Sequence, residues 1–233
     1  EPAAGYAAAG GQILDAWRSV YLVGHVRTAT DTQASYARAL TFGLIPADQA
    51  HAAAARLAEL VHEAGNHLTT GFLATGRLLP ALADAGYADV AYGLLFQRTE
   101  PSWLTMVDRG ATTVWEDWDG IDRDGTPHES LNHYSKGAVA RFLHTHTLGL
   151  RQAVGSAGWA RFVVAPHPDR RVTWARGHHD TPRGRISVDW RLDRDRLQVE
   201  IDSPASCEGT LVLPDGRSVD IEPGLFTFSA TLI

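Results

Sequence analysis

The sequence predicts two unlike parts, an all-α region followed by an all-β region. Over about the first 150 residues, apolar side chains recur at steps of three or four, the period of an amphipathic helix. After about residue 158 the step changes to two, the period of a half-buried strand. With 233 residues, 44% of them hydrophobic, the chain is long enough to bury a core in each part. We therefore expect two domains, at residues 1–155 and 156–233.

The first two expected helices are defined by end signals and apolar faces. Residues 31–44 follow Asp31, a residue type that favours the N-cap position, and place apolar side chains on one face. Pro46 suits the first turn of a second helix over 46–64, because the amide hydrogen that proline lacks is unused there. Gly65 follows as a stop signal.

Three further helices continue this pattern toward residue 150. Thr75 is expected to cap a short helix that Gly86 ends. Residues 87–98 and 134–149 each carry an apolar stripe, and the second stripe includes His146, which we expect to be a hydrogen-bonded core histidine. Short links between helices of about 10–18 residues suggest stacked helical hairpins.

The second region has the pattern of short antiparallel strands. Pro214, Asp215 and Gly216 form a turn signal between two of its apolar runs. Strands that recur every 8–12 residues or so, with turns between them, indicate a small antiparallel β-sandwich. The alternating apolar residues are Ile186, Val188, Trp190, Leu197, Val199, Ile201, Val219, Ile221, Phe226 and Phe228.

Residues 101–134 hold the densest group of chemically useful side chains. The segment has little helical or strand period, so we expect it to be mostly loop, yet it contains three tryptophans and seven acidic residues. Sugar rings pack their C–H faces on indoles, and a carboxylate flanked by indoles is suited to acid–base chemistry, so the segment suggests a carbohydrate site. The alternative is that the tryptophans plug the base of the helical domain and the acids form a solvated turn.

Composition argues against several classes of protein. The 21 basic residues form no stripe that would bind phosphates, so no nucleic-acid partner is expected. No apolar run approaches the roughly 20 residues of a membrane helix, and no signal peptide is visible, so we expect a cytoplasmic protein without membrane contact. The first residue is not Met, and we expect a processed product or a piece of a longer protein.

No cofactor and no metal site are expected. Cys207 is the single cysteine, which excludes an internal disulfide and a cysteine-based zinc site, and we expect it to be inert. His62 and His67 nearly complete a zinc-binding HExxH motif, but the spacing is one residue too long and Gly65 interrupts the helix. The run His178, His179 and Asp180 is expected in a solvated turn. Motifs of serine hydrolases and nucleotide-binding loops are absent.

Four strings carry a more specific signal: NHLTTGF at 66–72, PSWLTMV at 101–107, RGATTVWEDWDG at 109–120 and LNHYSKGAV at 131–139. In order and spacing they resemble the bacterial α-L-rhamnosidases of glycoside hydrolase family 78. Segments 31–46 and 161–190 are similar to that family as well. The resemblance implies an (α/α)6 toroid of six helical hairpins followed by a β-sandwich, and hydrolysis of terminal α-L-rhamnosides with inversion.

The resemblance also assigns roles to single residues. In the family the glutamate of the WExW motif is the general base, which corresponds to Glu116 here, and the histidine of the NHY motif contacts the sugar. Trp115 and Trp118 flank the base and are candidates for sugar binding, and the same strings contribute Trp103, Asp119 and Asn132 as further candidates. The candidate sugar-binding residues are His133, Trp115, Trp118, Trp103, Asp119 and Asn132.

The chain departs from the family pattern in what it lacks. The family's general acid lies in an upstream segment without a counterpart here, and we count six or seven helices where a closed toroid needs 12. We therefore expect a fragment that has the general base alone and is inactive by itself. Its expected partners are a rhamnose-containing substrate, the rest of the parent polypeptide and a second copy of the chain. The alternatives are a non-catalytic carbohydrate-binding or scaffold module, and a lyase or other hydrolase on the same toroid.

Overall fold

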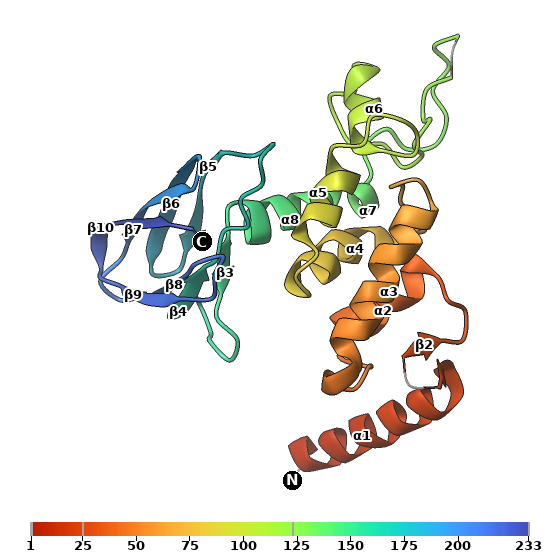
Figure 1. Ribbon diagram of the computed structural model, residues 1–233, viewed down its shortest axis with the longest axis horizontal. Coiled ribbons are helices and arrows are strands. Elements are labelled where there is room, and N and C mark those ends of the chain that lie inside the picture. The colour runs from red at the N-terminus through yellow and green to blue at the C-terminus, as the bar shows by residue number, and fades with distance from the viewer. Residues whose placement is uncertain (1, 25, 123, 233) are drawn as a thin grey trace. The chain divides into compact units, whose positions relative to one another are not determined.

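The structure is a computed structural model that describes residues 2–24, 26–122 and 124–232. It divides into two compact units, a helical unit at Glu1–Val139 and a β unit at Ala140–Ile233. Figure 1 shows helices in the first and strands in the second. An α region followed by a β-rich region is thus the order that the sequence predicts. Within the described ranges, no helix has the length and apolar character needed to cross a membrane.

The helical unit contains helices of very different length, and a long irregular segment between Asp108 and Tyr134 separates α6 from α7. A two-residue ribbon, β1 (Leu22–Val23) and β2 (Arg27–Thr28), follows the first helix, and a 3-10 turn (Ala47–Gln49) precedes the third. The helices are α1 (Pro2–Tyr21), α2 (Gln33–Thr41), α3 (Ala50–Glu63), α4 (Phe72–Asp84), α5 (Ala88–Leu95), α6 (Trp103–Asp108) and α7 (Tyr134–Gly137), and α8 (Val139–Phe142) crosses into the β unit.

Small side chains bring the central helices of this unit close together. Helix α4 packs against α2, α3, α5 and α7, and α2 packs against α3. Gly76 of α4 has no room for a side chain, because a Cβ there would lie 2.6 Å from the Cβ of Ala138. The fully buried residues between these helices include Tyr36, Ala37, Ala39, Ala53, Ala54, Leu57, Leu78 and Leu82. Alanine therefore sets the helix spacing, and leucine fills what remains.

The helix ends differ from three of the expectations. Thr32, and not Asp31, is the N-cap of α2, because Asp31 has a φ of 42° and its carboxylate binds elsewhere. Thr75 caps nothing: Gly71 is the N-cap of α4, and the Thr75 hydroxyl donates to carbonyl oxygens one turn back. The helix expected over 134–149 breaks into α7, α8 and a π-helix at Leu143–Thr147.

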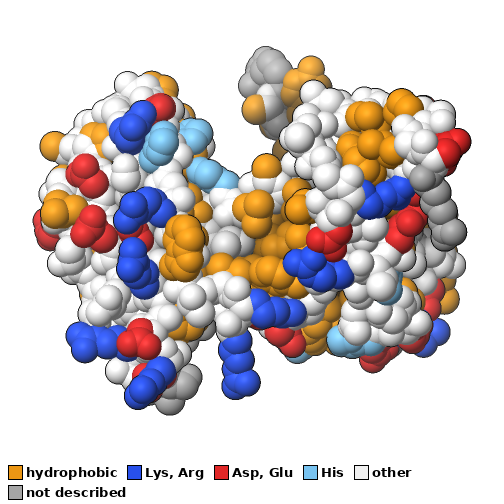
Figure 2. Space-filling view, turned by 90° about the horizontal axis from the view of Figure 1, so that it is seen from above, with side chains coloured by type: hydrophobic (Ala, Val, Ile, Leu, Met, Phe, Trp, Pro, Cys, Tyr) orange, Lys and Arg blue, Asp and Glu red, His pale blue; other side chains and the backbone are white. Residues whose placement is uncertain are grey.

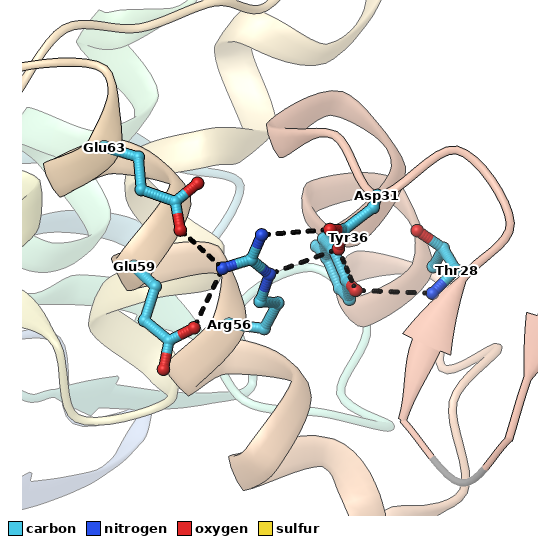
Figure 3. A network of polar contacts seen from close by, with 6 residues as sticks. All are labelled: Thr28, Asp31, Tyr36, Arg56, Glu59 and Glu63. Atoms are coloured by element: carbon cyan, nitrogen blue, oxygen red, sulfur yellow. Dashed lines mark hydrogen bonds and ion pairs between the residues drawn. The ribbon is translucent and has the colours of Figure 1, made fainter.

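An ion-pair network fixes the approach to α2 (Figure 3). Arg56 of α3 forms a bidentate pair with Asp31 at 2.9 and 3.2 Å and reaches Glu59 at 2.9 Å and Glu63 at 2.7 Å. The Tyr36 hydroxyl donates to Asp31 at 2.7 Å. The hydrogen bonds from Arg56 and Tyr36 hold the pKa of Asp31 below its usual range. The unusual φ of Asp31 is therefore held by charge-assisted bonds to both helices.

The β unit contains two four-stranded sheets. One has the order β10-β7-β6-β5 and is antiparallel throughout; the other has the order β3-β4-β8-β9. In the second sheet β4 pairs with β8 in parallel, which corrects the expectation of an all-antiparallel domain. The strands are β3 (Leu150–Gln152), β4 (Arg161–Val164), β5 (Trp174–Thr181), β6 (Gly184–Asp193), β7 (Arg196–Ser203), β8 (Glu208–Val212), β9 (Ser218–Ile221) and β10 (Gly224–Thr231).

Both sheets contribute to one hydrophobic core. Trp190 of β6 is fully buried, and its indole N–H donates to the Thr147 carbonyl oxygen of the π-helix at 2.9 Å. Gly209 of β8 lies directly over the Phe162 ring of β4, a contact that leaves no space for a Cβ. Cys207 is buried in the same core. The predicted turn at Pro214–Gly216 joins β8 to β9 and is confirmed.

Of two expectations for the histidines of the β unit, the structure contradicts one and agrees with the other. His178 and His179 lie in β5, so the expected solvated turn is wrong; the β5 strand continues to Thr181. His146 is buried and stacks on Phe142 at 5.2 Å between ring centroids, as expected for a core histidine. Among the residues that the structure describes, no group of three or more His, Cys, Asp or Glu side chains could hold a metal ion.

The outer face of the β10-β7-β6-β5 sheet is a mixture of charges. Arg176 pairs with Asp189 across β5 and β6, and Arg185 pairs with Asp180 at 2.7 Å. Figure 2 shows basic and acidic side chains interspersed over the visible face of this unit. Arg185 and Asp180 are both more than half exposed, so their pair contributes little to stability.

The Asp31 network predicts a pH-dependent stability difference. Asp31→Asn removes the carboxylate that Arg56 grips and should lower the free energy of unfolding by about 1–2 kcal/mol near neutral pH. Because the folded-state pKa of Asp31 is lowered, its stabilisation is present above the unfolded-state pKa and is lost as pH falls through the folded-state pKa. Denaturant unfolding, followed by helical circular dichroism at about pH 7 and about pH 2, checks this. Glu59→Gln is the control, since Glu59 is mostly exposed and should cost less than about 0.5 kcal/mol. Equal losses for the two variants would contradict the prediction.

Candidate functional site

Two distant parts of the acidic, tryptophan-rich segment are held together by backbone hydrogen bonds. The Glu116 amide donates to the Ser130 carbonyl oxygen at 2.7 Å, and the His133 amide donates to the Val114 carbonyl oxygen at 2.8 Å. These bonds close the loop between residues 116 and 133 without forming a regular strand. As a result Glu116 and His133 lie side by side, as the sequence analysis expects of one site.

The carboxylate and the imidazole face each other. His133 Nε2 lies 3.8 Å from Glu116 Oε1. The other ring nitrogen, Nδ1, accepts from the Ser135 amide at 3.3 Å and contacts the Ser135 hydroxyl at 2.8 Å, which makes His133 the N-cap of α7. A neutral imidazole that accepts at Nδ1 carries its proton on Nε2, the nitrogen that faces Glu116.

Glu116 is held in place but not enclosed. Its second oxygen, Oε2, accepts from the Ser130 amide at 3.4 Å, and the side chain is 38% exposed, compared with 20% for His133. A carboxylate in this state keeps lone pairs available to a water molecule or a hydroxyl group. It has the geometry needed to accept a proton from an incoming ligand.

The three tryptophans of the segment have different environments. Trp115 and Trp103 are 2% and 6% exposed, so they belong to the framework. Trp118 is only partly buried, and Trp103 meets it edge-on with ring centroids 5.4 Å apart. The Trp103 indole N–H donates to the Lys136 carbonyl oxygen at 2.9 Å. Of the three, Trp118 therefore keeps part of its side chain accessible to solvent.

The remaining candidates lie at the edge of the loop. Asp119 and Asn132 are exposed; the Asp119 carbonyl oxygen contacts His128 Nε2 at 2.9 Å, and the Asn132 amide donates to the Ser130 hydroxyl at 3.3 Å. Asp119 borders a hollow of about 690 Å³, which is also lined by Glu100, from the segment before α6, and by Arg109 and Asp122. The structure thus brings Glu116 to His133 and Trp103 to Trp118, and places Asp119 at a neighbouring hollow.

The sequence analysis missed three side chains beside the candidate pair. Phe72, at the start of α4, meets the His133 ring edge-on at 6.2 Å, and Tyr134 stacks on it at 4.9 Å. Both are exposed, at 52% and 75%. The third is Lys136, which is buried and lies over Trp118. The NHLTTGF and NHY strings contain the two aromatics, so a search for exposed rings at predicted helix starts could have found them.

The helical unit and the β unit each match a domain of a known glycosidase family. Residues 1–147 match the bacterial alpha-L-rhamnosidase 6 hairpin glycosidase domain, and residues 149–224 match the bacterial alpha-L-rhamnosidase C-terminal domain. The chain belongs to the bacterial α-L-rhamnosidase family, which are glycoside hydrolases. The family expected from the four strings is confirmed.

Individual relatives agree with this family. An α-L-rhamnosidase of Streptomyces avermitilis is 41% identical over 184 residues, which are 77% of this chain and 18% of that protein. One of Alteromonas sp. is 34% identical over 195 residues, 81% of this chain and 21% of that protein. The chain therefore spans about a fifth of the curated relatives it matches.

Solved structures match over nearly the whole chain. The Streptomyces avermitilis α-L-rhamnosidase complexed with L-rhamnose has a TM-score of 0.85 at 35% identity. The match covers 99% of this chain and 24% of the Streptomyces chain. The native Aspergillus terreus α-L-rhamnosidase has a TM-score of 0.91 at 30% identity. The match covers 98% of this chain and 27% of the Aspergillus chain.

The double role of His133 leads to a stability test. His133→Ala removes the cap of α7 and should lower the free energy of unfolding by about 1 kcal/mol. His133→Asn keeps a side chain that caps well, so it should cost only a few tenths of that amount. Denaturant unfolding of both variants measures the difference. If the asparagine variant were as unstable as the alanine variant, the cap would not be what His133 contributes to folding.

Proposed function

We propose that this chain supplies the general base of an inverting α-L-rhamnosidase that removes terminal α-L-rhamnosyl residues from glycosides. The observation that carries the proposal is the Glu116–His133 pair, 3.8 Å apart in the domain that matches the rhamnosidase family. The relative of known structure that binds L-rhamnose supports the choice of sugar.

Glu116 would act on water. An inverting glycosidase uses one carboxylate to take a proton from the attacking water, while a carboxylic acid on the other side of the bond protonates the leaving oxygen. The Ser130 amide holds one oxygen of the Glu116 carboxylate, and the other oxygen, 3.8 Å from His133 Nε2, can accept the proton of a bound water. The His133 Nε2–H would donate to a sugar hydroxyl, and the open part of Trp118 would pack on the C–H face of the ring.

The general acid is proposed to lie outside the residues of this chain. In inverting enzymes the two carboxyl groups are about 6.5–9.5 Å apart with the sugar and a water between them. Asp117 and Asp122 flank the same side chain instead, since His128 lies 3.7 Å from the first and 3.6 Å from the second. They share one short exposed loop with Glu116, so they do not supply an acid across the sugar.

The exposed apolar side chains of helix α1 favour the presence of further polypeptide packed against it. Large apolar side chains are exposed along it, and Figure 1 shows it apart from the other helices of its unit. A helix with so much exposed apolar surface is stabilised by burial against further polypeptide. We propose that the rest of a longer protein packs here, completes the (α/α)6 toroid and contributes the acid; a second copy of the chain is the other candidate. The exposed residues are Tyr6, Ile13, Val20 and Tyr21.

A second function, sugar binding without cleavage, uses the same residues. Glu116, His133 and Trp118 could hold a sugar in this chain even where no acid faces them. Titration of the chain with L-rhamnose by calorimetry, next to an assay with an aryl α-L-rhamnoside, separates the two functions.

The base assignment predicts a selective loss of rate. In the full-length protein that contains this chain, Glu116→Gln should lower kcat for an aryl α-L-rhamnoside by more than about 100-fold, because the carboxylate no longer accepts the proton of water. Asp117→Asn is the matched control and should change kcat by less than about tenfold. Near-normal kcat for the Gln variant together with an inactive Asn variant would show that the base is Asp117.

The chain by itself should not turn over rhamnosides. Without a general acid the rate should fall by about 10²–10⁴-fold relative to the full-length protein. Steady-state assay of both proteins on one aryl α-L-rhamnoside measures this ratio, and NMR of the first-formed sugar in the full-length reaction checks for inversion. Turnover by the chain within about tenfold of the full-length rate would place an acid among these residues.

A further inference from the structure

Lys136 is an unusual residue in an unusual position. It is the only lysine in the sequence, while the other basic residues are arginines. It lies in α7, three residues after His133, and is only 6% exposed. A lysine is almost never buried unless its charge has a partner, because removing an ammonium group from water is costly. Its surroundings should therefore show what the charge contributes.

The ammonium group of Lys136 meets an aromatic ring. Its Nζ atom lies 4.6 Å from the centroid of the Trp118 ring, within the range of a cation–π contact. The Lys136 carbonyl oxygen accepts from the Trp103 indole, and Trp103 in turn meets Trp118 edge-on. Lys136, Trp103 and Trp118 thus form a closed cluster in which one residue holds both indoles, one by its backbone and one by its charge.

The cluster borders the acidic loop. Asp117, Glu116 and Asp119 all favour the charged form of Lys136, whereas burial disfavours it more strongly and lowers the pKa of the ammonium group. The cation is therefore poised between a desolvating pocket and three carboxylates. The contact of Nζ with the Trp118 ring uses this charge directly.

We infer that Lys136 is a positioning residue of the candidate sugar site: its ammonium group fixes the Trp118 indole, so that the open part of the ring meets the sugar in one orientation. The inference rests on the proposed rhamnosidase function. Lys136 acts through Trp118, because Lys136 itself is only 6% exposed whereas Trp118 is partly exposed.

A simpler explanation is that the four-carbon stem of Lys136 only fills space in the core. Lys136→Met keeps an unbranched apolar stem and removes the charge, whereas Lys136→Arg keeps a charge that stacks well on an indole. If packing alone matters, methionine should replace lysine without effect on the sugar site. If the charge matters, arginine should restore what methionine loses.

The contact itself can be tested in the chain without any assay of activity. Because Lys136 is the only lysine, selective ¹³C-lysine labelling gives one set of side-chain NMR signals. The ring current of Trp118 should shift the Hε signals upfield, and Trp118→Leu should return them toward their usual position. Hε signals that are unshifted in the unmodified chain would overturn the inference.

The role in the site is tested by a double-mutant cycle in the full-length protein. Lys136→Met should raise KM for an aryl α-L-rhamnoside by about 5- to 20-fold and change kcat by less than about threefold, since a loosened Trp118 weakens sugar binding more than chemistry. Lys136→Arg should recover most of the KM. In a Trp118→Leu background, Lys136→Met should have no further effect on KM, because the residue through which it acts is gone.

Controls separate the possible failures. Arg98→Met removes a positive charge from a side chain that is 66% exposed and should leave KM unchanged; an equal rise in KM for it would make the effect one of net charge. If Lys136→Met does not fold, Lys136→Gln replaces it in the cycle. An unchanged KM for Lys136→Met or Lys136→Gln would overturn the inference and leave the proposed function standing. The same holds if the effects of Lys136→Met and Trp118→Leu on KM are additive. No hydrolysis by the unmodified full-length protein overturns the proposed function and the site role of Lys136 with it, even where the NMR contact is present.

Discussion

The backbone pairing of residues 114–116 with residues 130–133 is the constraint on which the candidate site depends. It consists of the bonds from the Glu116 amide to Ser130 and from the His133 amide to Val114. Because His133 also caps α7, the pairing joins the loop to a helix that packs on α4. The position of the carboxylate is thus set by a helix end and not by the loop alone. This is how an irregular segment can hold reactive groups at fixed separation.

The gross architecture was readable from the sequence, because it follows from periodicity. Strands β6 and β7 carry the alternating residues that the sequence predicts, and each pairs in register with the other. Periodicity does not determine what depends on single dihedral angles or on distant partners. The cap at Thr32 follows from the positive φ of Asp31, and the parallel pairing of β4 with β8 joins segments far apart in the chain. The sequence analysis names no helix over Pro2–Tyr21, because the Ala- and Gly-rich first half of that segment has a single large apolar side chain, Tyr6.

The sequence predicts which residues form the candidate site but not how deeply each side chain is buried. The resemblance named Glu116 and His133, and the structure brings them together. It gave the same role to Trp115 and Trp118, yet the first is buried and the second is partly exposed, because burial depends on what the rest of the loop covers. Lys136 was not singled out, since a lysine in an amphipathic segment is normally on the solvent face. Only the three-dimensional contact with Trp118 gives it a place in the site.

The close approach at Gly76 has a consequence for how substitutions in this protein would be interpreted. A side chain at that position would press on Ala138, at the end of the helix that His133 begins. Displacing α7 would shift the His133 imidazole relative to the Glu116 carboxylate, although residue 76 is not part of that pair. In a library that randomises α4 and is selected for activity, position 76 would therefore tolerate only glycine and would be mistaken for a substrate contact. Selection for activity would therefore also act on the packing of α4 against Ala138.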